Sequence, residues 1–577
     1  MGGESIKQAK KQSFLHGGLV MMGGTFVAKF IGFFYKIIIV NIIGSEGFGY
    51  YSTAYSIYGP LYYLSIAGLP VALAKIVTEN AQRGLDGVVA QAFRVAKRLF
   101  TCVGFVLMLI MLLFSDYLSA WAGNPKAKLT IIALAPVALF SCISSAYKGY
   151  YEGLLNMYPT TLSEIIEAVG KLVFGSVFAL IGMRVGATGF SQTGAIFGVT
   201  VSTRHSAEII CGAAGAILGI SASCVIGSCF LAARRKFDGA IITSGEEKST
   251  KEMVSTILSL AVPIGLGSIV SKISGFIDAR TLQNGLKHAF AAEPLFFKNM
   301  AGAVRTSDIP ALLWGGYSSV LSIYNFIPSI LVSFGVSLLP NLAAAWSSNN
   351  ANNVKKYMES ALRITNIMAI SAGLTVTASA RSILMLLLAK RTTEVPLIVP
   401  ALRILGFCIV FSAFTTTLNI VFQSIGRVKL PIIMMVIGVT IKYAVNKGLV
   451  AIPEINIKSG AIGTLACYLF IAAVEFWLVR KFTRTKINIK SVFVKPILVG
   501  ICTMITGFFA EWVSSYLPGV QARWIKNLFA LGLPILACGV FVFVFRALEE
   551  EDVLMLPHGD RFATFLKKHK LISFHPE

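Results

Sequence analysis

Ionisable side chains inside long apolar stretches are the residues of this chain most able to do chemistry. A charge at the middle of a bilayer costs about 2.5–3.5 kcal/mol on insertion scales, so it faces a polar cavity, pairs or reaches an interface. Lys29 and Lys36 lie about two helical turns apart on one face of the first apolar stretch, with no acid within helical reach. We expect Lys29 to face a cavity, whereas Lys36 either does the same or snorkels toward an interface.

A second set of ionisable residues lies in the apolar stretch 158–182. Glu167 and Lys171 are four residues apart with the acid first, which is the favourable order for a helical ion pair. Glu164 lies on the same face of the helix. Two interpretations stay open: a satisfied pair that packs against another helix, or the wall of a polar cavity that also serves as an ion relay.

Further ionisable residues extend the predicted site. Lys272 and Asp278 are expected at the outer mouth of the cavity, and Lys442 lies in a later stretch without a neighbouring glutamate. Within the apolar stretches, lysines that have no acid nearby in the sequence outnumber acids that have no lysine nearby. The cavity should therefore be cationic, and a cationic cavity suits a phosphate or pyrophosphate group. We therefore expect Lys29, Lys36, Lys272 and Asp278 to contact a substrate head group. Glu164, Glu167, Lys171 and Lys442 are expected to form a cavity wall or an ion relay.

Residues for catalysis, metal binding or cofactor binding are not indicated. All six histidines lie outside the apolar stretches, and no zinc-protease, nucleophile-elbow or phosphate-loop motif occurs. The nine cysteines lie in apolar stretches and suggest packing. Two acidic features are expected to be solvated: Glu475, near the inner end of its stretch, and the run Glu549–Asp552. We expect no catalytic residue, no metal and no cofactor.

The elements that would position these residues are membrane-spanning helices. Of 577 residues, 55% are apolar and 14% are charged, whereas soluble domains have about 45–50% and about 25%. A span needs about 20 apolar residues, and about fourteen stretches qualify. They are 18–43, 48–72, 97–115, 129–148, 158–182, 208–231, 254–276, 311–340, 362–380, 398–425, 430–451, 459–479, 492–514 and 525–546.

The net charge of +24 has a topological explanation. With the N-terminus inside, the inner segments carry about twice as many lysines and arginines as the outer ones. This surplus predicts that both termini are cytoplasmic. It also removes the need for a nucleic-acid partner, because no long soluble segment offers a basic face.

An internal repeat indicates two lobes. The stretch Tyr51–Tyr58 recurs at Tyr317–Tyr324 with an offset of 266, and Lys171 recurs as Lys442. Parallel repeats are a known transporter construction. We predict an all-α polytopic membrane protein with two six-helix lobes in a pseudo-two-fold repeat and two extra C-terminal helices. The predicted parts are an N-terminus 1–17, an N-lobe 18–231, a linker 232–253, a C-lobe 254–479, a helix pair 480–546 and a cytoplasmic tail 547–577.

Several motifs resemble one known family. Residues 28–36 of the first apolar stretch resemble the first span of the stage V sporulation protein B family. The loop 43–50 that follows (Ile-Gly-Ser-Glu-Gly-Phe-Gly-Tyr) resembles the loop after that span. Residues 67–75 (Ala-Gly-Leu-Pro-Val-Ala-Leu-Ala-Lys) and the turn 147–160, which begins Tyr-Lys-Gly-Tyr-Tyr-Glu-Gly, also resemble that family. The similarity extends from about residue 15 to 545.

That resemblance implies membership of the multidrug, oligosaccharidyl-lipid and polysaccharide exporter superfamily, which includes lipid II flippases. It implies alternating access, a bacterial cytoplasmic membrane location, and a cationic cavity for the head group of an undecaprenyl-pyrophosphate-linked sugar. Membrane lipid would contact the last two helices, and cell-wall synthesis proteins would be partners. By this likeness Lys29, Lys36 and Lys272 are the first-choice head-group contacts, although flippase relatives often use arginine instead.

Three other functions stay open at this point. A drug or cation antiporter of the same superfamily would need unpaired acids, for which Glu164 and Glu167 are the candidates. A membrane enzyme acting on the same lipid would form product from a lipid-linked precursor and a nucleotide sugar. A scaffold of the wall-synthesis machinery would function without Lys29 and Lys36.

Overall fold

The structure, a computed structural model, describes residues 14–63, 68–193, 195–196, 199–238, 249–302, 304, 306–516, 523–550 and 552. Within these ranges the chain is helical apart from turns and one short antiparallel pair, in which Ala195 lies opposite Thr200 and Ile196 opposite Val199. The predicted all-α fold class is thereby confirmed.

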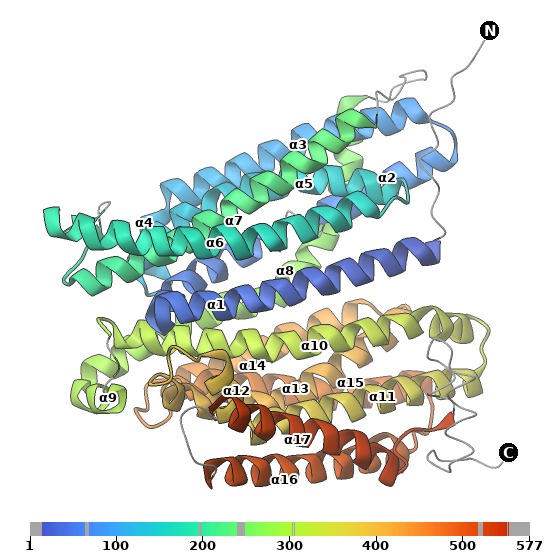
Figure 1. The fold of residues 1–577 in the computed structure, drawn as a ribbon. Coiled ribbons are helices and arrows are strands. Elements are labelled where there is room, and N and C mark those ends of the chain that lie inside the picture. The colour runs from blue at the N-terminus through green and yellow to red at the C-terminus, as the bar shows by residue number, and fades with distance from the viewer. Residues whose placement is uncertain are drawn as a thin grey trace. The chain divides into compact units, whose positions relative to one another are not determined.

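The chain divides into two compact units. The first unit comprises 1–287 and 305–319, and the second comprises 288–304 and 320–577. The first holds α1 (Phe14–Tyr63), α2 (Leu69–Gln82), α3 (Asp86–Leu113), α4 (Ser115–Trp121), η2 (Pro125–Ala127), α5 (Lys128–Gly153), α6 (Tyr158–Thr193), β1 (Ala195–Ile196), β2 (Val199–Thr200), α7 (Arg204–Phe237) and most of α8 (Thr250–Ala292). Within this unit α5, α6 and α7 run side by side, with α1 against α6 (Figure 1).

The second unit continues from the end of α8. It holds α9 (Pro294–Ala301), most of α10 (Ile309–Ser347), α11 (Ala351–Ala378), α12 (Ala380–Leu387), α13 (Val395–Ser424), α14 (Lys429–Leu449), α15 (Lys458–Thr483), η3 (Lys490–Val494), α16 (Lys495–Tyr516) and α17 (Arg523–Val544). α13 packs against α11 and α15, and α14 packs against α15. α16 and α17 lie side by side (Figure 1).

The first helix joins two predicted spans into one element. At about 1.5 Å per residue, the 50 residues of α1 would extend about 75 Å if straight, more than twice the hydrocarbon core of about 30 Å. The chain breaks the helix at Gly44, whose φ of 72° lies in the left-handed region that glycine tolerates. The kink falls in the predicted loop between 18–43 and 48–72, so α1 is long enough for two crossings.

Eleven helices, counted over the described residues, are long and apolar enough to cross a membrane. The predicted spans 254–276 and 311–340 lie in α8 and α10, where some side chains fall outside the described residues. The count of fourteen stays a prediction. Most of the predicted N-terminus 1–17 and most of the tail 547–577 lie outside the described residues.

A buried glutamate fastens the start of α10 to α1. The Glu46 carboxylate accepts hydrogen bonds from the Tyr50 hydroxyl at 2.9 Å, the Thr306 hydroxyl at 2.9 Å and the Ser307 backbone N–H at 2.9 Å. Beside them, Asp308 forms an ion pair with Lys126 at 3.3 Å. The segment before α10 is therefore held by polar contacts within the first unit.

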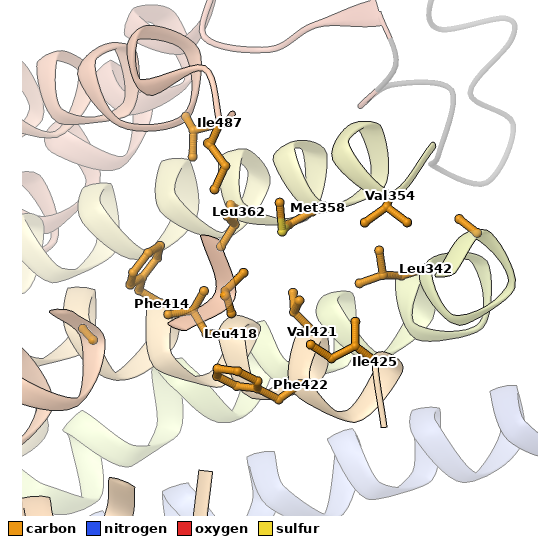
Figure 2. Packing of buried hydrophobic residues seen from close by; sticks show 14 residues of the cluster. Leu342, Val354, Met358, Leu362, Phe414, Leu418, Val421, Phe422, Ile425 and Ile487 are labelled. Atoms are coloured by element: carbon orange, nitrogen blue, oxygen red, sulfur yellow. The ribbon is translucent and has the colours of Figure 1, made fainter. Parts of the chain in front are cut away.

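The core of the second unit is an apolar cluster between α10, α11, α13 and α15. Met358 and Leu362 of α11 point toward Leu418 and Phe422 of α13 (Figure 2). Ala472 and Val479 of α15 complete the same cluster, together with Val492 of η3. Their packing fixes which side of α15 faces α13.

An ion network anchors the end of α17 to α11, and here one expectation is wrong. Arg363, only 1% exposed, donates to the Asp552 carboxylate at 2.6 and 2.7 Å and pairs with Glu549 at 2.7 Å. Ser491 bridges Arg363 and Glu549. The sequence predicts that the run Glu549–Asp552 is solvated, but Glu549 and Asp552 are buried. Their burial is possible because the Arg363 guanidinium neutralises their charge.

Arg363→Met should destabilise the second unit by about 3–5 kcal/mol, because it leaves two buried carboxylates without their cation. Thermal unfolding of the full chain in detergent measures the loss. Arg403→Met is the matched control, since Arg403 is half exposed and meets Glu511 only at 3.8 Å, which predicts a cost below about 1 kcal/mol. Equal melting temperatures for the two variants would contradict the anchoring role.

Candidate functional site

Three of the predicted site residues lie close together inside the first unit, beside a lysine that the sequence did not single out, Lys148. Lys148 of α5 lies 3.8 Å from Glu164 and 3.7 Å from Glu167, both on α6. Lys171 lies 3.9 Å from Glu167, which is the ion pair that the i, i+4 spacing predicts. Glu164, Glu167, Lys148 and Lys171 are called the ion-pair cluster below.

Neighbouring helices cover the ion-pair cluster only partly. The side chains of Lys148 and Glu167 are 19% and 14% exposed, and those of Glu164 and Lys171 are more open. Thr25 of α1 donates to Glu164 at 3.2 Å. On the other side Gly227 of α7 packs against the Glu167 side chain. The cluster is therefore a polar patch shared by α1, α5, α6 and α7.

The register of α1 against α6 locates the two predicted head-group lysines of the first helix. Gly24 packs against Thr161, and Tyr35 packs against Gly175, so the two helices run parallel. By this register Lys29 lies at the level of Glu167, on the neighbouring helix, and Lys36 lies about two turns farther on. Lys29 is exposed and has no ion pair among the described residues, whereas Lys36 is half-buried.

The other predicted site residues lie elsewhere. Lys272 is in α8, and its side chain falls outside the described residues. Asp278, also in α8, is buried within the first unit. Lys442 is buried in α14, which belongs to the second unit. The structure brings together Glu164, Glu167 and Lys171 from the predicted set.

Sequence reasoning missed Lys148 as a member of the site. It falls at the end of the predicted span 129–148 and reads there as an ordinary inner-side lysine. A signal was present, because Lys148 stands between Tyr147 and Gly149 in a small-residue and tyrosine motif. Gly149 and Gly153 pack closely against α2, so α5 is held with Lys148 facing α6.

The internal repeat has a structural counterpart. Tyr58 donates a hydrogen bond to Ser141 at 3.3 Å in the first unit. Tyr324, 266 residues after Tyr58, lies near Ser412 in the second unit, and Ser412 follows Ser141 by 271 residues. A neighbouring tyrosine and serine thus occur at both copies of the repeated string.

These features define a polytopic helical membrane protein of two units with a charged patch inside one of them. The family model described as "Polysaccharide biosynthesis protein" matches residues 14–346, more than half of the chain, and a second model, MatE, matches 299–447. The chain belongs to the polysaccharide biosynthesis protein family.

Relatives and solved structures agree with this assignment. Stage V sporulation protein B of Bacillus subtilis is 20% identical, over 95% of this chain and 98% of the relative. Lipid II flippase MurJ of the same organism is 20% identical, over 79% and 81%.

Two solved structures share the fold. An inward closed conformation of lipid II flippase MurJ aligns with a TM-score of 0.62 at 12% identity, over 91% of this chain and 99% of that one. An inward-facing multidrug resistance MATE family transporter aligns with a TM-score of 0.63 at 15% identity, over 79% and 94%. These likenesses show that the chain shares its fold with lipid II flippase MurJ and with a MATE family transporter.

Lys148→Met should lower stability by about 1–3 kcal/mol at neutral pH, because Glu164 and Glu167 then face each other without the shared cation. Adding Glu167→Gln should recover part of the loss, because it removes one of the two carboxylates that Lys148 neutralises. Thermal unfolding of the four combinations in detergent measures both effects. An equal loss from Lys148→Met with and without Glu167→Gln would contradict the electrostatic role of Lys148.

Proposed function

We propose that this protein is a flippase that moves an undecaprenyl-linked cell-wall or polysaccharide precursor, of the lipid II kind, across the bacterial cytoplasmic membrane. Alternating access of the two units would carry the head group, and no bond would be made or broken. Membership of the polysaccharide biosynthesis protein family and the likeness to stage V sporulation protein B and MurJ support this proposal. Spore cortex or peptidoglycan synthesis would be the process served.

The observation that carries the proposal is the charge of the α1–α5–α6 patch. Lys148 and Lys171 pair with Glu164 and Glu167, Glu152 lies beside Lys148, and Lys29 places a further cation at the same level of the unit. An anionic head group such as a pyrophosphate is attracted to such a patch, since lysine is a point charge that binds phosphate without a fixed geometry. Lys36 would extend the patch along α1.

A cation antiporter of the same superfamily is less well supported. Such a protein needs acids that are available to an organic cation, but Glu164 and Glu167 each lie within ion-pair distance of Lys148. The MATE likeness speaks for a shared fold alone. The remaining predicted contacts, Lys272 and Asp278, and the second-lobe wall residue Lys442 belong to the proposal as expectations.

The proposed arrangement has both termini in the cytoplasm, lobes at 18–231 and 254–479, and membrane lipid against the helix pair 480–546. The undecaprenyl tail would lie in lipid beside that pair while the head group crosses. Cell-wall synthesis proteins are the proposed partners that supply or use the substrate.

Complementation of a flippase-depleted bacterial strain tests the function. The wild-type chain should restore growth, and Lys29→Ala should restore it poorly, because loss of one charge-assisted phosphate contact of about 1.5–3 kcal/mol weakens binding at least tenfold. Lys75→Ala is the control, since Lys75 is exposed and among the described residues pairs with Glu79 alone.

The outcomes separate the two parts of the proposal. Full rescue by Lys29→Ala would contradict the head-group role of Lys29 but not the flippase function. A well-expressed wild-type chain that fails to rescue, together with cation efflux in a transport assay, would favour the antiporter instead.

A further inference from the structure

Glu475 is a carboxylic acid buried in the second unit, and it has no partner among the described residues. It lies in α15, within a helix that is long and apolar enough to cross a membrane, and its exposed fraction is 0%. Neither of its carboxyl oxygens has a hydrogen-bond partner among the described residues. The sequence predicts a solvated side chain here, and that prediction is wrong.

The surroundings of Glu475 are apolar. Ala472 and Val479 lie three residues before and four residues after it, on the same face of α15. Both belong to the cluster that contains Leu418 and Phe422 of α13 (Figure 2). The helical stripe that carries Glu475 is therefore the one that packs on α13.

The second neighbour, α14, also presents an apolar surface at this level. Gly438 packs against Cys467 and Ile471, and Gly463 packs against Asn446, so α14 and α15 run antiparallel. By this register Glu475 lies near the first turns of α14, at the level of Met434. Lys442 lies about two turns away along α14.

The charged residues on the elements packed around Glu475 have other positions or partners. Arg403 of α13 reaches Glu511, and Arg427 of the α13–α14 connection lies over the Phe482 ring. Arg480 lies over the Phe476 ring, and Lys481 lies over the Trp477 ring. Lys429, Lys447 and Lys490 are exposed. Glu394 and Lys458 lie at the first ends of α13 and α15, far along each helix from position 475. No described cation neutralises Glu475.

An ionised carboxylate in such an enclosure is strongly disfavoured, and the usual outcome is that the group binds a proton. The contrast with Glu549 and Asp552 is direct, because those buried acids have Arg363. Helix movements of an alternating-access cycle would admit water to the α13–α15 seam and restore the ionised form. A group whose proton affinity differs between two conformations couples proton binding to the change between them.

We propose that Glu475 is a proton-binding site that carries H⁺ through the transport cycle. In the enclosed conformation the side chain is the neutral acid, and in the opened conformation it releases H⁺ to water and becomes the carboxylate. The coupling to transport rests on the function proposed above, whereas the protonation of Glu475 does not.

Infrared spectroscopy of the full chain in vesicles of phosphatidylethanolamine and phosphatidylglycerol tests the protonation. At neutral pH the difference spectrum between wild type and Glu475→Gln should contain the carbonyl band of a protonated carboxylic acid. Glu454→Gln is the matched control, because Glu454 is an exposed acid in the connection before α15, and it should leave that band unchanged. Absence of the band from the Glu475→Gln difference spectrum would overturn the proposal.

The coupling is tested in the same vesicles with a lipid-linked precursor and an imposed pH gradient. The wild-type chain should flip the precursor faster with the gradient than without it, and Glu475→Gln should lose that acceleration while keeping its melting temperature. An unchanged response to the gradient in Glu475→Gln would overturn the coupling. A wild-type chain that flips no precursor would refute the flippase function, and the infrared result would still decide the proton site.

Discussion

The neutralisation of charge in an apolar interior is the constraint on which the organisation of this protein depends. Lys148 sits between Glu164 and Glu167 and joins α5 to α6, while Lys171 completes the set from within α6. Thr25 attaches α1 to the same group. A charge that enters the membrane region therefore decides which helices must be neighbours, because an isolated charge there is too costly.

The second unit uses the same constraint in two different ways. Arg363 binds Asp552 and Glu549 and donates to Ser491, so its network fixes the segment after α17 against α11 and η3. Glu475 has an equally buried position but no counter-charge among the described residues. A satisfied ion network resists change, whereas an acid without a partner is stable only as long as its proton stays bound.

Much of the architecture could be predicted from local patterns. The apolar stretches predict helices, since every backbone polar group in lipid must be paired within the segment. The break in α1 falls at the predicted loop, where Gly44 adopts a left-handed φ. The Glu167–Lys171 pair follows from helical spacing alone. The role of Lys148 and the burial of Glu475 and Asp552 were not predictable this way, because their surroundings come from other helices.

The sequence by itself determined a helical membrane protein with an internal repeat and a few ionisable residues inside its apolar stretches. These properties depend on composition, period and short-range spacing. Only the tertiary structure decided which of those residues have partners. Lys148 brings Glu164 and Glu167 together, and Arg363 binds Glu549 and Asp552, whereas Glu475 has no partner among the described residues. The physical reason is that helix packing, which side-chain shape controls over long sequence separations, sets the distance between charges on different helices.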